Sequence, residues 1–138
     1  MKEEVFLYQD FTFRLRGLLF EVQNELGHYC NEKQYGDSFE NKLKKEKIEY
    51  RREFILPQSF EGERFHRNRV DFIVKKEKIF IIIELKVVSA LTRDDYYQCQ
   101  RYLQALNLDL ALLVNFRPKY IMIKRLLNVE KYHREKNQ

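Results

Sequence analysis

The chain has 138 residues, of which 44% are hydrophobic and 14% aromatic, which is enough for one folded domain and excludes a disordered chain. Two cysteines are too few for a disulfide scaffold, and no apolar run approaches the roughly 20 residues of a membrane span. The net charge of +5 permits attraction to a polyanion. Because the acidic N-terminus also lacks an apolar signal core, the sequence predicts a cytoplasmic protein.

Two helices are predicted in the first third of the chain. Apolar residues recur at helical spacing over residues 5–26, which predicts an amphipathic helix. Residues 28–36 are polar and are expected to form a loop. Asp37 or Ser38 is then expected to cap a second, charged helix that ends near Lys47.

The rest of the chain is predicted to contain five strands and one further helix. Thr92-x-x-Asp95 is a capping-box pattern, which predicts a helix that ends near Leu106. Short runs of β-branched and aromatic residues predict the strands. These runs are residues 50–59, 67–74, 79–87, 110–115 and 120–125.

This order of elements, α-α-β-β-β-α-β-β, predicts the fold class. A helix between strands indicates a crossover, so we expect an α/β fold with a mixed sheet of about five strands and helices on both faces. A single domain is expected over residues 1–127. Residues 128–138 are polar and are expected to fray as a C-terminal tail.

Charged residues interrupt two strands that are otherwise apolar. Glu84 and Lys86 lie two apart within the run FIIIELKVV and therefore share a face, and Asp71 interrupts RVDFIV. If these strands form an antiparallel hairpin, Asp71 approaches Glu84. Two adjacent carboxylates repel unless a cation lies between them or one is protonated, and their oxygens suit Mg²⁺ or Mn²⁺. Lys86 beside such a metal could activate water against a phosphodiester.

The spacing of these residues resembles a known signature. Asp71, twelve residues, and then Glu84-Leu85-Lys86 is similar to the D-(x)n-E-x-K motif of the PD-(D/E)XK nuclease superfamily, and more narrowly to small bacterial GxxExxR-type proteins. Val70 precedes Asp71 where the superfamily commonly has proline. The matching pieces are Gly17-x-x-x-Glu21-Val22 with Glu25-Leu26-Gly27, Ser38-Phe39-Glu40-x-x-Leu43, Arg69-x-Asp71-Phe72-x-Val74, Ile83-Glu84-Leu85-Lys86, Gln98-x-x-x-Tyr102-Leu103 and Leu112-Leu113-Val114-Asn115-Phe116.

The resemblance implies a three-layer α/β/α core and Mg²⁺-dependent (or Mn²⁺-dependent) cleavage of nucleic acid, with Asp71 and Glu84 as metal ligands. It also implies an additional acid from the helix before the first strand, for which Glu40 is the match and Glu21 the rival. Gln98 matches the glutamine that follows the E-x-K strand, whereas helical periodicity alone does not separate it from Gln100.

Other interpretations of these residues stay open. Glu40 is also compatible with the N3 position of a capping box begun by Asp37, and Glu84 and Lys86 with a salt bridge at a sheet edge. Four arginines are candidates to contact the backbone of a nucleic acid, and such contacts would position phosphate without reading sequence. These are Arg67, Arg69, Arg93 and Arg101.

Three functions are compatible with these features. The first is a metal-dependent nuclease that acts on nucleic acid, with DNA as the preferred hypothesis, through Asp71, Glu84, Lys86, Glu40 and Gln98. The second is a binding module on a nuclease fold, which has no chemical need for Asp71, Glu84 and Lys86 together. The third is a toxin-like or defence component that acts with neighbouring genes.

Overall fold

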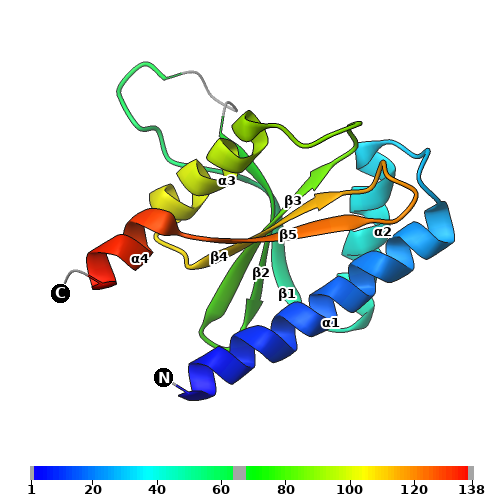
Figure 1. The fold of residues 1–138 in the computed structure, drawn as a ribbon, viewed down its shortest axis with the longest axis horizontal. Coiled ribbons are helices and arrows are strands. Elements are labelled where there is room, and N and C mark those ends of the chain that lie inside the picture. The colour runs from blue at the N-terminus through cyan, green and yellow to red at the C-terminus, as the bar shows by residue number, and fades with distance from the viewer. Residues whose placement is uncertain (1, 64–67, 137–138) are drawn as a thin grey trace.

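The computed structural model describes residues 2–63 and 68–136 and has one mixed β-sheet (Figure 1). The strands lie in sequence order, and β1–β2, β2–β3 and β4–β5 pair antiparallel while β3–β4 pair in parallel. This confirms the predicted α/β fold with a mixed five-stranded sheet. The strands are β1 (Glu49–Ile55), β2 (Arg69–Lys76), β3 (Ile79–Lys86), β4 (Leu110–Asn115) and β5 (Met122–Leu127).

Helices cover both faces of the sheet (Figure 1). The helices are α1 (Lys2–Leu26), α2 (Glu32–Lys45), α3 (Arg93–Leu106) and α4 (Val129–Lys136). One face packs against α1 and α2, the other packs against α3, and α4 lies beside α3. Within residues 2–63 and 68–136, no helix is both long enough and apolar enough to cross a membrane.

The alternation of side chains along β3 builds both cores. Ile81 and Ile83 pack toward α1 and α2, whereas Ile82 packs toward α3. Every residue of β4 is buried, because the strand lies inside the sheet and is covered on both faces. The parallel pair β3–β4 therefore forms the centre of the molecule, and the carboxyl ends of both strands lie at the same end of the sheet.

The second helix begins earlier than the sequence predicts. Asn31 is its N-cap: Oδ1 of Asn31 accepts the Gln34 backbone N–H, and Oε1 of Gln34 accepts the Asn31 backbone N–H, both at 2.8 Å. Tyr35 lies in the first turns of this helix and is fully buried. The expected loop over residues 28–36 and the expected cap at Asp37 or Ser38 are therefore wrong, because a buried helical stripe starts inside the polar segment.

The end of the chain also contradicts the expectation. Residues 129–136 form α4 instead of a frayed tail. Asn128 organises this helix: its Nδ2 donates to the carbonyls of Leu103 and Leu108, and its Oδ1 accepts the N–H of Lys131. Lys131 also pairs with Asp109 at 2.7 Å. These contacts hold α4 against the domain, although this polar helix has no large apolar face.

Candidate active site

The alternation of β2 breaks at Asp71. Val70 packs in the α3-side core and Phe72 in the α1/α2-side core, although strict alternation would place them on one face. Glu53 lies between the paired residues Arg52 and Phe54 of β1, at the level of Asp71, and has a left-handed backbone, with φ of 55°. Such local breaks bend a strand and redirect a side chain. Here the break turns Asp71 toward the neighbouring strand β3.

Two carboxylates replace main-chain hydrogen bonds between β2 and β3. The paired register ends at Phe72 and Ile83. Beyond it, the Asp71 N–H donates to Oε1 of Glu84, and the Leu85 N–H donates to Oδ2 of Asp71, both at 2.8 Å. Because strand N–H groups lie in the sheet plane, the two carboxylates lie in the gap between the strands. We call this gap, formed by Asp71, Glu84 and Leu85, the seam.

The seam brings two carboxyl groups together, one buried and one half-buried. Glu84 is 3% exposed. Burial, and next the charge of Asp71, raise the pKa of Glu84 well above its usual range, and burial raises the pKa of Asp71. Among the described residues, neither carboxylate forms an ion pair with a lysine or arginine. Two oxygen-donor groups that lack a counterion fit a shared proton or a hard cation.

Lys86 extends from the seam toward α3. Its Nζ donates to Oε1 of Gln98 at 3.0 Å and lies 3.7 Å from Oδ1 of Asp95. Asp95 also accepts the Thr92 backbone N–H at 2.8 Å, so one carboxylate caps α3 and contacts the lysine. Gln100 points elsewhere and donates to the Leu127 carbonyl. The structure thus brings Gln98, and not Gln100, to Lys86.

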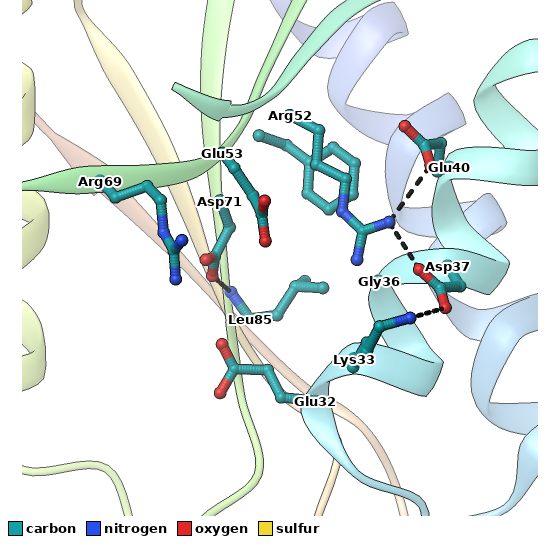
Figure 2. Close-up of a pocket in the computed structure, with 11 residues that line it drawn as sticks. Glu32, Lys33, Gly36, Asp37, Glu40, Arg52, Glu53, Arg69, Asp71 and Leu85 are labelled. Carbon is teal, nitrogen blue, oxygen red and sulfur yellow. Dashed lines mark hydrogen bonds and ion pairs between the residues drawn. The ribbon is translucent and has the colours of Figure 1, made fainter. Parts of the chain in front are cut away.

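A pocket of about 610 Å³ opens on the α2 side of the seam (Figure 2). Its walls come from α2, β1, β2 and the end of β3. Figure 2 shows the carboxylates of Glu32, Glu53 and Asp71 facing the same space, with the Arg69 side chain beside them. Loss of water around its carboxyl group, and next the charge of Asp71, raise the pKa of Glu32. Glu32 is therefore coupled electrostatically to the seam.

Glu40 lies in the same pocket but contacts a different partner. Its Oε1 accepts from Nη1 of Arg52 at 3.2 Å, and Asp37 accepts from the same nitrogen at 2.7 Å (Figure 2). Arg52 also lies over the ring of Phe72, 5.4 Å from its centroid. Glu32 lies about two turns earlier on α2 and is the acid of this helix that faces Asp71.

Sequence reasoning missed Glu32 because it placed the start of α2 too late. The Asn31-x-x-Gln34 capping box was the available signal. The capping box begun by Asp37, considered as another role for Glu40, is absent, since Asn31 is the cap. The rival acid, Glu21, lies on α1 and pairs with Lys42 at 3.5 Å.

The predicted phosphate contacts lie in different places. Arg69 lines the pocket with Asp71. Arg93 and Arg101 are exposed on α3. Arg67 lies outside the described residues. In the described part of the chain, no group of three or more His, Cys, Asp or Glu is placed to hold a metal ion, so a metal at the seam would have two carboxylates as its protein ligands.

Known proteins resemble this chain in family and in fold. A family model described as the PD-(D/E)XK nuclease superfamily matches residues 9–126. The crystal structure of SSO0001 is similar in fold, with a TM-score of 0.50 at 18% identity, over 82% of this chain and 66% of that one. This chain thus spans about two thirds of that protein's length. No curated protein matches the sequence. Because the family model covers most of the chain, the protein belongs to the PD-(D/E)XK nuclease superfamily.

Proposed function

We propose that this protein is a metal-dependent nuclease that hydrolyses phosphodiester bonds, with DNA as its substrate. One observation carries the proposal: the buried Glu84 and the half-buried Asp71 meet in the seam, neither forms an ion pair with a lysine or arginine of the described residues, and Lys86 follows Glu84 on β3. Burial of a charged group is unfavourable unless the group is paired with an opposite charge or binds a metal. Asp71 and Glu84 would gain such an interaction by holding a hydrated divalent cation.

The donor set fits Mg²⁺ or Mn²⁺. Asp71 and Glu84 would hold the ion through carboxylate oxygens, and water would complete the coordination shell. When bound, such an ion polarises a phosphoryl oxygen and makes water a better nucleophile. Because only two protein ligands are present, binding should be weak and should depend on deprotonation of the seam.

The chain's own residues then have distinct roles. Lys86 carries a positive charge to the edge of the seam, where it can bind the attacking water or a phosphate oxygen and stabilise the negative charge that develops. Gln98 and Asp95 orient Lys86 from α3. Arg69 lies in the pocket and is suited to hold a flanking phosphate. Glu32 faces the seam from α2, in the position that Glu40 was expected to occupy.

A cleavage assay with separate binding measurements tests this proposal. Lys86→Ala should lose about a hundredfold or more of cleavage while it keeps Mg²⁺ binding and most nucleic-acid affinity, because Lys86 acts mainly in the transition state. Asp71→Asn should lose metal affinity by calorimetry. Lys78→Ala, in the exposed β2–β3 turn, is the matched control and should cleave like the wild type.

The substrates should include single-stranded, duplex and branched DNA, and RNA of the same sequence. If wild type with Mg²⁺ or Mn²⁺ cleaves none of them and yet binds with strong salt dependence, the protein is a binding module and the proposal fails. Cleavage of RNA alone would retain the nuclease and reject DNA as the substrate. Arg69→Ala should weaken binding with a shallower salt dependence, because one phosphate contact is lost.

A further inference from the structure

Three turns come together at the carboxyl ends of β3 and β4, next to the seam. They are the α1–α2 turn (residues 27–31), the β3–α3 connection (87–92) and the β4–β5 turn (116–121), and Figure 1 shows them near one another. The His28 ring donates from Nδ1 to the Arg117 carbonyl at 3.0 Å. Asn115 donates to the Val88 carbonyl at 2.8 Å and accepts the Arg117 N–H. These bonds join the three turns into one surface.

This surface is continuous with the candidate active site. The Phe116 N–H donates to the Lys86 carbonyl at 2.9 Å, so the β4–β5 turn starts beside the proposed catalytic lysine. The Tyr35 ring stacks on Phe116, with centroids 4.2 Å apart, and Tyr35 belongs to the same helix as Glu32. The three turns therefore adjoin the candidate active site.

The three turns carry basic residues and no acidic ones. None of the residues in the three turns is Asp or Glu, in a chain that has 21 acidic residues. At the opposite end of the sheet, three connections contain an acid, namely Glu46 before β1, Glu77 between β2 and β3, and Asp109 before β4, and the fourth is Asn128 before α4. Arg117 and Lys119 are exposed in the β4–β5 turn. The surface beside the site thus suits a polyanion.

Two tyrosines stand on this surface with their rings in solvent. Tyr29 is 82% exposed and Tyr120 is 78% exposed. The ring of His28 contacts that of Tyr29, with centroids 4.2 Å apart, and Nζ of Lys119 lies 5.6 Å from the Tyr120 centroid. Neither tyrosine ring contributes to a core. We call Tyr29, Arg117, Lys119 and Tyr120 the tyrosine rim.

We propose that the tyrosine rim binds an unpaired stretch of the nucleic acid, with bases stacked on Tyr29 and Tyr120 and phosphates against Arg117 and Lys119. Exposed aromatic rings beside cations, on turns that contain no acid, are the features that hold single strands, because every base offers a face for stacking. In a duplex the bases already stack on one another. This inference rests on the proposed nucleic-acid substrate and adds that the substrate has a single-stranded segment next to the cleaved bond.

Binding to labelled oligonucleotides in EDTA tests the proposal without cleavage. The probes are oligothymidylate and oligouridylate of about 15 nucleotides, and a DNA duplex of similar length, followed by fluorescence anisotropy. Tyr29→Ala/Tyr120→Ala should weaken binding to single strands by about tenfold for each ring, with little change for the duplex. If the double alanine variant loses affinity for both single strands, the rim binds DNA and RNA alike. If it loses affinity for only one of them, that probe identifies the nucleic acid that the rim binds.

Two further variants separate stacking from damage to the fold. Tyr29→Phe/Tyr120→Phe keeps both rings and should bind like the wild type. Phe13→Ala removes a ring that is 81% exposed on α1 and should leave binding unchanged. Arg117→Gln should reduce the salt slope by about 0.7, the loss of one phosphate contact on a single strand.

The proposal is overturned if wild type does not bind single strands, if the double alanine variant binds them within about twofold of wild type, or if duplex affinity falls equally. These outcomes are separable from failure of the nuclease proposal. A protein that binds single strands through the rim and never cleaves them refutes the nuclease alone. A protein that cleaves normally, with rim variants that bind like the wild type, refutes the rim alone.

Discussion

Lys86 is held between two acceptors of α3, the neutral Gln98 at 3.0 Å and the charged Asp95 at 3.7 Å. Asp95→Asn keeps an oxygen that can accept the capping hydrogen bond but removes the charge that faces the ammonium. We expect about a tenfold loss in kcat with little change in KM, because a lysine held less firmly stabilises the transition state less well. Steady-state cleavage kinetics measure both constants.

Asp94→Asn is the control for this variant. Asp94 lies in the same first turn of α3 and contributes the same charge to the helix N-terminus. A loss of activity that is equal in the two variants would show that Asp95 acts through the helix and not through Lys86. Thermal unfolding of both proteins separates any change in stability from the change in kcat.

At this scale the sequence located the residues whose chemistry is unusual for their position. Asp71, Glu84 and Lys86 were conspicuous because they are charged residues inside apolar strands; the structure joins Asp71 and Glu84 in the seam and turns the Lys86 side chain to Gln98. Glu32 was not conspicuous, since an acid in a polar segment has no pattern of its own. The break in alternation at Asp71 and Glu53 was also hidden, because it depends on the pairing of two strands.

At the scale of elements, α2 and β1 meet through a glycine and an arginine. A Cβ at Gly36 would lie 2.5 Å from Nη2 of Arg52, so alanine would displace the guanidinium from Asp37 and Glu40. In an Arg52→Ala background, Gly36→Ala should stabilise the protein by about 0.5–1 kcal/mol, the usual gain inside a helix. In the wild-type background that gain should disappear or reverse, with a coupling of about 1 kcal/mol.

Urea denaturation of the four proteins in this cycle measures the coupling. Gly17→Ala is the internal control, because a Cβ at Gly17, in the middle of α1, has no atom within 4 Å. It should stabilise the protein equally with and without Arg52. Additive effects of Gly36→Ala and Arg52→Ala would mean that the close contact does not constrain α2.

The sequence predicted elements where periodicity was strong and missed them where local contacts decide. The strands β3 and β4 end within one residue of the predictions, because apolar runs that are buried on both faces have sharp ends. The start of α2 depends on a cap in a segment that is polar throughout. Helix α4 depends on Asn128 and on the Lys131–Asp109 pair, which are contacts with distant parts of the chain.

At the scale of the whole molecule, the seam makes stability depend on pH. The ordinary pKa values are 4.5 for Glu84 and 3.8 for Asp71, and both are raised in the folded protein. A raised carboxyl pKa means that the folded state holds its proton more firmly than the unfolded state does. This contribution to stability is therefore complete below the ordinary values and is lost as pH rises through the raised ones.

In EDTA, the free energy of unfolding should accordingly fall as pH rises above the ordinary pKa values of the two carboxyl groups. Glu84→Gln should show a shallower fall and a higher relative stability at pH 8, whereas Glu77→Gln in an exposed turn should follow the wild type. Addition of Mg²⁺ at pH 8 should restore stability in the wild type and not in Glu84→Gln, because the ion binds the ionised pair. Identical pH profiles for Glu84→Gln and wild type would contradict this account.

The hydrogen bonds that the two carboxylates accept from strand N–H groups in the seam also bear on how the sequence of such a protein evolves. Loss of either carboxylate leaves a strand N–H without its acceptor, which costs about 1–3 kcal/mol in a buried place. Even a protein of this fold that acts only as an adaptor would therefore be selected to keep Asp71 and Glu84. The Lys86 side chain bonds to Gln98 and not to a strand N–H. In a protein of this fold without catalysis, Lys86 is therefore the position that we expect to be substituted first.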